Sequence, residues 1–305
     1  MSETPRRETG IEWPTIGLML GCYALWALAT TWAAVFWLPL GIVLAAIAIA
    51  FHSSLTHEAL HGHPFGDARL NEATVFACLG LFVPYRRFRD LHLAHHVDSI
   101  LTDPYDDPES NYMDPAVWAR LPRWVQRLLI VNNTLAGRMI VGPAIGMAVF
   151  LRDDWRSIRN GDARVLNAWV MHVPGVLLVL AWVVWSPMPL WAYFVAAYAG
   201  FSVLKIRTFL EHRAHERASG RTVVIEDTGP LALMFLNNNL HVVHHMHPGA
   251  AWYRLPRLFR ENREKYLARN GGYYYRSYAQ IFADHFLRPK DPVPHPLWPH
   301  ADREG

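Results

Sequence analysis

Two long stretches of this sequence contain no Lys, Arg, Asp or Glu: residues 13–57 and residues 165–204. Each stretch is about twice the roughly 20 apolar residues that one helix needs to cross a bilayer. Each also has a proline-containing turn near its middle, at Pro39 in the first stretch and at Pro187 in the second. This pattern predicts an all-α integral membrane protein, in which two helical hairpins make four transmembrane crossings at about 15–36, 40–60, 166–185 and 190–211.

The distribution of positive charge predicts the orientation of these hairpins. All 29 Lys and Arg residues lie outside the two uncharged stretches, and cytoplasmic segments are enriched in such residues. We therefore expect both termini and the polar segments to be cytoplasmic. The polar N-terminus leads into a span too long for the core of a signal peptide, so we expect no cleavage. We expect a single domain over residues 1–305, with a core at about 15–285 and flexible tails at 1–12 and 289–305.

Three parts of the expected cytoplasmic cap have a distinct character. Residues 73–85 are apolar but too short to span, which predicts a re-entrant or interfacial helix. Residues 128–151 are apolar with basic flanks, so they predict helices along the lipid headgroups or ordinary helices that cover the domain. Residues 254–269 predict a basic amphipathic helix that faces anionic lipid, an acidic redox partner or only water.

Several classes of site are excluded by the residues present. The two cysteines, Cys22 and Cys78, form no Cys-x2-Cys pair, so the chain offers neither an iron–sulfur site nor a zinc ribbon. It has no Gly-x-Gly-x2-Gly loop for a nucleotide cofactor and no nucleic-acid-binding motif. We expect no nucleic-acid partner.

The histidines are concentrated just outside the predicted crossings. They form three clusters and one further position: His57 and His61; His92, His95 and His96; His241, His244 and His245; and His212. Within each cluster the spacing places the side chains on one face of a helix. The two hairpins would bring all four groups to the inner membrane boundary. Nine imidazoles exceed what one ion can bind, so two ions are implied, and nitrogen-rich sites that tolerate six ligands favour iron over zinc.

Other interpretations of these histidines remain open. Residues 57–61 also spell the HExxH pattern of zinc proteases, with Glu58 as general base, but a protease leaves the other clusters unexplained. A metal transporter would place its ligands near the bilayer midplane, whereas these lie at the inner boundary. His212 alone could be a surface residue or a helix cap. We expect His172 to be a hydrogen-bonded structural residue, and the neighbours of the clusters to support the ligands or face solvent: His63, His215 and His247.

The three clusters together resemble the histidine boxes of the membrane fatty acid desaturase superfamily, which also includes hydroxylases and carotenoid ketolases. The resemblance covers roughly residues 40–260 and extends to the sequence around the boxes: Asp103-Pro104, Asp107-Pro108, Glu211-His212-Arg213, Asn237-Asn238-Asn239-Leu240 and the segment from His244 to Pro256. The third box is similar to that of the small bacterial dihydrorhizobitoxine desaturase-like proteins.

This resemblance implies an oxygen-dependent di-iron enzyme of the bacterial inner membrane, with its metal site on the cytoplasmic side. The implied iron ligands are His57, His61, His92, His95, His96, His212, His241, His244 and His245, and the residues expected to support them are Glu58, Asp107, Glu211 and Asn238. The implied reaction is desaturation of a fatty acyl or other lipid-like substrate, with hydroxylation or ketone formation as the alternative. We expect a separate electron donor, such as ferredoxin with its reductase, because the chain has no redox cofactor motif of its own.

Overall fold

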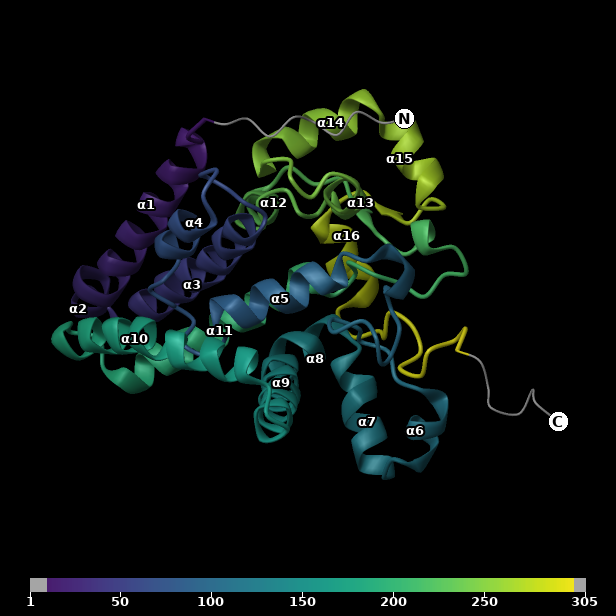
Figure 1. The fold of residues 1–305 in the computed structure, drawn as a ribbon, viewed down its shortest axis with the longest axis horizontal. Coiled ribbons are helices and arrows are strands. Elements are labelled where there is room, and N and C mark those ends of the chain that lie inside the picture. Colours follow the sequence, from purple (N-terminus) through teal and green to yellow (C-terminus); the bar gives the residue numbers. More distant parts are fainter. Residues whose placement is uncertain (1–9, 299–305) are drawn as a thin grey trace. The chain divides into compact units, whose positions relative to one another are not determined.

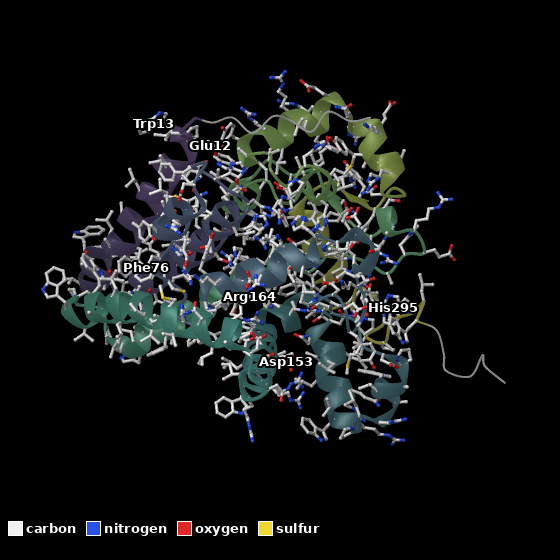
Figure 2. All side chains as sticks on the ribbon, viewed as in Figure 1. Glu12, Trp13, Phe76, Asp153, Arg164 and His295 are labelled. Atoms are coloured by element: carbon white, nitrogen blue, oxygen red, sulfur yellow. The ribbon has the colours of Figure 1, made fainter. Side chains whose placement is uncertain are left out.

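The computed structural model of the protein describes residues 10–298, whose side chains are drawn in Figure 2. The chain is mostly helical and divides into two compact units, with the elements labelled in Figure 1. The first unit comprises residues 1–89 and 143–204, and the second comprises residues 90–142 and 205–305. The single domain expected over 1–305 stays a prediction.

The first unit begins with a helical hairpin. Helix α1 (Trp13–Leu28) continues through a π-helical turn (Ala29–Ala33) into α2 (Ala34–Phe36). Trp37 is extended and interrupts the helix, and α3 (Leu38–Leu60) then begins with proline in its first turn, where no backbone N–H is needed. A Cβ on Gly41 would lie 2.9 Å from the Ala29 carbonyl oxygen, so only glycine permits this close approach. The turn predicted near Pro39 is confirmed.

The remaining helices of this part of the sequence are α4 (Ala68–Thr74), α5 (Tyr85–His95), α9 (Gly142–Arg159), α10 (Ala163–Trp185) and α11 (Leu190–Thr208). The carboxylate of Asp162 caps α10 by accepting from the backbone N–H groups of Arg164 and Val165. The chain then turns at residues 186–189, as the prolines there predict.

Three helices of the described residues are long and apolar enough to cross a membrane: Trp13–Phe36, Leu38–Leu60 and Ala163–Trp185. Much of their surface consists of exposed apolar side chains, such as Trp32 and Leu177. Helix α11 is not among the three, because Tyr193, Tyr198 and two basic residues lower its hydropathy. Three apolar helices therefore support membrane association, and the fourth crossing and the orientation stay predictions.

The apolar stretch 73–85 is not the helix that its composition predicts. Helix α4 ends at Thr74, and residues 75–84 form a loop. The Leu79 carbonyl accepts a hydrogen bond from the Tyr193 hydroxyl at 2.8 Å, and the Leu81 carbonyl accepts one from His172 Nε2, also at 2.8 Å. Side chains of α10 and α11 thus replace helical hydrogen bonds, which lets a buried apolar loop satisfy its backbone. The structural role expected of His172 is confirmed.

The second unit contains short helices and a minimal sheet. The elements after α5 are α6 (Pro115–Arg120), α7 (Arg123–Asn132), α8 (Leu135–Ile140), β1 (Val224–Ile225), α12 (Pro230–Met234), α13 (His241–Met246), α14 (Leu255–Glu261), α15 (Arg263–Arg269), β2 (Tyr274–Tyr275) and α16 (Tyr278–His285), with short 3₁₀ turns at Asp98–Ile100, Ala218–Gly220 and Trp252–Arg254. Strands β1 and β2 pair in parallel, an addition to the predicted all-α fold. The helices expected within 128–151 are present, whereas the helix expected over 254–269 is interrupted at Asn262.

The C-terminal segment is packed rather than flexible over its described part, which corrects the prediction for 289–305. Met113 donates its backbone N–H to the Val293 carbonyl at 3.0 Å, and His295 donates its N–H to the Met113 carbonyl at 2.8 Å. Val293 and His295, the latter labelled in Figure 2, are each 8% exposed. In the tail expected at residues 1–12, the Glu12 carboxylate lies 2.7 Å from His63 Nδ1. Residues 1–9 and 299–305 lie outside the described residues.

Candidate metal centre

Seven of the predicted ligands belong to the second unit. They lie at the end of α5, on α13 and in the segment that follows α11. His92 and His95 occupy the last turn of α5, and His96 follows directly. Helix α13 consists of His241 to Met246 and carries the third cluster on one face. The lone His212 follows the last residues of α11. Helical spacing therefore places the side chains of each cluster on one helix face, from which they divide between two groups of imidazoles.

Four of these imidazoles form one group: His95, His212, His241 and His245. Their candidate donor atoms all lie within 4.8 Å of one another. The Nε2 atom of His212 is 2.8 Å from that of His95 and 3.0 Å from that of His241. His212, which belongs to no local cluster in the sequence, is therefore at the centre of the group.

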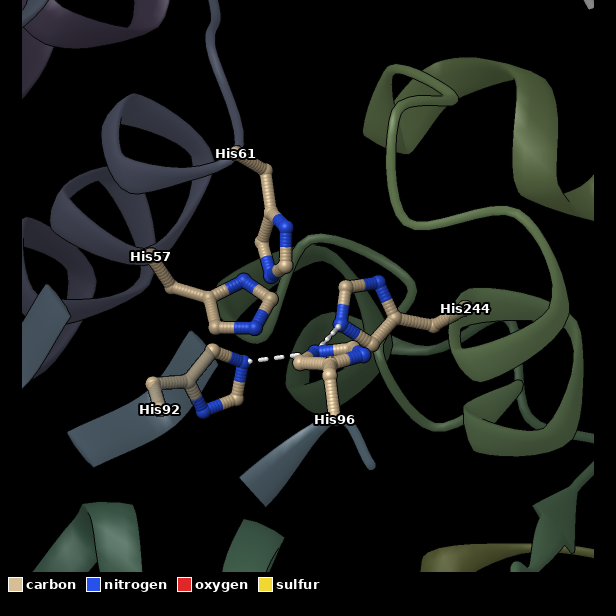
Figure 3. Close-up of side chains that lie close together, drawn as sticks. All are labelled: His57, His61, His92, His96 and His244. Carbon is tan, nitrogen blue, oxygen red and sulfur yellow. Dashed lines mark hydrogen bonds between the residues drawn. The ribbon is translucent and has the colours of Figure 1, made fainter. Parts of the chain in front are cut away.

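The other three imidazoles, drawn in Figure 3, form a second group in the same unit. The Nε2 atom of His96 lies 2.9 Å from that of His92 and 3.1 Å from that of His244. The two groups are adjacent, because the rings of His96 and His245 stack at a centroid distance of 4.4 Å. The second unit thus holds two neighbouring sets of convergent imidazoles.

His57 and His61 belong to the first unit, at the C-terminal end of α3. Their rings are 4.7 Å apart, which confirms that the i, i+4 spacing places them on one face. His57 is 2% exposed and Glu58, between them, is 3% exposed. This pair is a compact, buried, nitrogen-rich element at a helix end.

The geometry of the groups in the second unit fits bound metal ions. Two nitrogens that bind one ion at about 2.1 Å and at right angles lie about 3 Å apart, which matches the Nε2–Nε2 separations of 2.8–3.1 Å. In the described part of the chain, the buried Nε2 atom of His245 has no hydrogen-bond partner. A buried polar atom without a partner is costly, and a metal ion would remove that cost.

Carboxylates and an amide orient the rings from the opposite side. His95 Nδ1 is 2.7 Å from Asp107, and His241 Nδ1 is 3.2 Å from the side-chain oxygen of Asn238. Asn238 in turn donates to Glu211 at 3.0 Å. These contacts place Asp107, Asn238 and Glu211 where ligand-supporting residues are expected, because a partner on Nδ1 fixes the tautomer that presents Nε2 to a metal.

Two further carboxylates were not predicted from the sequence. Glu109 lies 2.9 Å from His92 Nδ1, and Asp98 lies 3.5 Å from His245 Nδ1. Both flank the Asp-Pro pairs that follow the second cluster, so the density of acidic residues over 98–109 was the available signal. Each gives the Nδ1 side of an imidazole of the site a carboxylate neighbour.

Burial lowers the pKa of three of these rings. Desolvation lowers the pKa of His245 to about 4, although Asp98 opposes the shift. Desolvation and the neighbouring histidines also hold the pKa values of His212 and His241 well below the usual range. Neutral imidazole is the form that binds metals. Burial would also lower the pKa of His95, but Glu109 and Asp107 outweigh it and raise that pKa to about 9.

The histidines next to the clusters have other partners. His63 pairs with Glu12, and His247 Nε2 lies 3.1 Å from the Tyr266 hydroxyl. His215 accepts from the Arg217 backbone N–H at 3.1 Å. None of these three belongs to the two metal groups found among residues 10–298.

Comparison with known proteins identifies the family. A family described as "Fatty acid desaturase" matches residues 30–278. The chain is also 25% identical over 227 residues to a protein named beta-carotene ketolase from Paracoccus sp., a match that covers 72% of this chain and 74% of that protein. Family, apolar helices and histidine groups together support a membrane oxidoreductase of the di-iron type. The chain belongs to the fatty acid desaturase family.

Proposed function

We propose that the protein is an oxygen-dependent di-iron membrane enzyme that introduces a double bond into a fatty acyl or other lipid-like substrate. The observation that carries the proposal is the pair of adjacent imidazole groups in the second unit, within a chain that belongs to the desaturase family. Family membership also favours this reaction class over the zinc protease that residues 57–61 could suggest.

The proposed ligands of one iron are His95, His212, His241 and His245. The proposed ligands of the other include His92, His96 and His244, which converge within the second unit (Figure 3). The resemblance of the histidine boxes leads us to propose His57 and His61 as further ligands of the di-iron site. Three imidazoles would leave an iron ion with an incomplete shell, since such ions accept up to six ligands. The i, i+4 pair at the end of α3 carries two more nitrogens of the same kind, which supports its proposed role as ligands.

When bound, the two irons would supply oxygen activation and the oxidising power to remove hydrogen from an unactivated C–H bond. The residues of this chain hold and orient the imidazoles. Asp107 and Glu109 accept from the Nδ1–H groups of His95 and His92 and so direct both Nε2 atoms inward. Near-complete burial of these two rings, each 1% exposed, keeps bulk water from their donor atoms.

We also propose how the substrate and the electrons reach the site. Three apolar helices suit a hydrophobic substrate that enters from the bilayer. The reaction needs two external electrons per double bond, and we propose a ferredoxin with its reductase as their source. The proposed location is the bacterial inner membrane, with the metal site facing the cytoplasm.

A second reaction is favoured by one specific observation. The relative named beta-carotene ketolase matches across most of both chains. The same arrangement could therefore insert oxygen at an activated methylene of a carotenoid-like substrate rather than remove a second hydrogen. The position of the substrate carbons relative to the irons would decide between the two outcomes.

The test combines metal analysis with product analysis. Purified protein should contain about two irons per chain, and cells that express it should accumulate a lipid with a new double bond. A new ketone or hydroxyl would select the second reaction instead. A stoichiometry of about one zinc per chain would contradict both.

A further inference from the structure

Helices α14 and α15 present a basic surface to solvent. Its exposed cations, here called the α14–α15 basic surface, are Arg257, Arg260, Arg263, Lys265 and Arg269. Three of them have acidic partners within 4.0 Å: Glu261, Glu226 and Asp98. Arg260 and Lys265 have no such partner among the residues that the structure describes. The surface therefore carries positive charge that its own carboxylates do not neutralise.

This surface is packed directly on the helix that carries the third histidine cluster. Leu255, Phe259 and Tyr266 point inward from α14 and α15 and form one core with Val242 and Val243 of α13. Tyr266 is 2% exposed, and its hydroxyl lies 3.1 Å from His247 Nε2, just after α13. A protein bound to the basic surface would be separated from the cluster by these two helices and the side-chain layer beneath them.

One contact brings the surface within reach of a proposed iron ligand. Arg269 Nη2 lies 3.2 Å from Asp98 Oδ2, and Asp98 Oδ1 lies 3.5 Å from His245 Nδ1. The Asp98 side chain is 40% exposed, whereas that of His245 is 2% exposed. At the edge of the basic surface, solvent therefore reaches Asp98, which lies directly beside a proposed iron ligand.

The composition of the surface favours a protein over a membrane. Helices that lie in a lipid interface expose large apolar side chains beside their basic ones. Of the described residues in 252–270, none is an exposed large hydrophobic, whereas α7 exposes Trp124 at 69% and Val131 at 51%. Glu261 and Glu264 also lie among the cations, as in surfaces that recognise a partner's charge pattern.

We propose that the α14–α15 basic surface is the docking site for an acidic electron-carrier protein. The inference rests on the proposed function, which creates the need for electrons. For each double bond formed, the substrate loses two hydrogens as two electrons and two protons. Two reduced carriers each give one electron and are oxidised, and two protons come from water. Dioxygen takes up the four electrons and four protons to give two water molecules.

The test measures binding of full-length protein in detergent to a plant-type [2Fe–2S] ferredoxin, an acidic one-electron carrier. The double variant Arg260→Glu with Lys265→Glu removes the two cations that lack partners and touches no proposed ligand. The matched control is Arg120→Glu with Arg123→Glu, an exposed pair at the end of α6 and the start of α7. We expect the surface variant to weaken binding by about tenfold or more at low salt, the control to have little effect, and added salt to reduce the difference.

Two further measurements separate this inference from the proposed function. Reduction of the irons by dithionite should be the same in the variant and in the unmodified protein, whereas reduction by ferredoxin should be slowed. Unchanged ferredoxin binding in the surface variant would overturn the docking site and leave the proposed reaction intact. Loss of binding to vesicles with anionic lipid, without loss of ferredoxin binding, would identify a membrane contact and also overturn it. Absence of product when iron-loaded protein is reduced, freed of excess dithionite and then exposed to dioxygen would count against the reaction alone, since the binding measurement needs no turnover.

Discussion

The Nδ1–H of His95 donates to the carboxylate of Asp107 at 2.7 Å, and both side chains are 1% exposed. The same carboxylate accepts from the backbone N–H groups of Thr102 and Glu109, at 2.8 and 2.9 Å. Asp107 is thus held rigidly by the loop after α5, and it holds His95 with Nε2 directed at His212.

This relationship predicts a loss of metal affinity when the carboxylate is removed. Asp107→Asn keeps the size of the side chain but removes its charge and replaces one of two accepting oxygens with a donating NH2 group, although both oxygens accept in the structure. The orientation and tautomer of His95 should therefore be held less firmly. We expect iron affinity to fall by about 10- to 100-fold, measured by competition with a chelator. Asp106→Asn, an exposed neighbour, is the control, and equal losses in both variants would refute the argument.

Removing one proposed ligand should empty one iron position. We expect His245→Ala to reduce the iron content from about two to about one per chain and to abolish turnover. His215→Ala is the control, because His215 lies outside both metal groups. Full activity of the His245 variant would contradict the proposed ligand set.

Metal uptake should release protons. The pKa of His95, raised to about 9 in the metal-free protein, means that this ring is protonated at neutral pH and must lose its proton to bind iron. Affinity should therefore rise as the pH increases from about 7 to about 9. Calorimetric titration of Fe²⁺ in buffers of different ionisation enthalpy measures the protons released. A result of no net release would show that His95 is already neutral.

The loop at residues 75–84 packs so closely against α10 that a larger residue at Gly175 should destabilise the fold. A Cβ on Gly175 would clash with the Phe76 carbonyl oxygen, whereas one on Gly17 would meet nothing within 4 Å. We expect Gly175→Ala to destabilise the protein by about 1–3 kcal/mol. Gly17→Ala should be neutral or slightly stabilising, because alanine favours a helix. Thermal unfolding in detergent compares the two, and equal midpoints would contradict the close packing.

The sequence predicted the hairpin turns and the histidine faces because both depend on short-range rules. Proline and extended residues interrupt helices locally, as at Trp37, and i, i+4 spacing fixes which rings share a face, as in His57 and His61. His212 belongs to no local cluster, and its position at the end of the fourth predicted crossing was what pointed to it.

Features that depend on distant partners were missed. Residues 75–84 are apolar enough for a helix, but hydrogen bonds from His172 and Tyr193, about a hundred positions away, stabilise a loop instead. Similarly, the proline-rich segment after residue 289 is held by Met113. Glu109 and Asp98 were overlooked because an acidic side chain in a polar loop resembles ordinary surface until its histidine partner is known.

The partly exposed Asp98 beside His245 has a consequence for the durability of the enzyme. The shell around the two irons would be thin at this carboxylate, which is 40% exposed, so hydrophilic chelators such as EDTA should extract the nearer ion first. Mild chelation would then yield a half-loaded form, visible as a two-phase loss of iron over time.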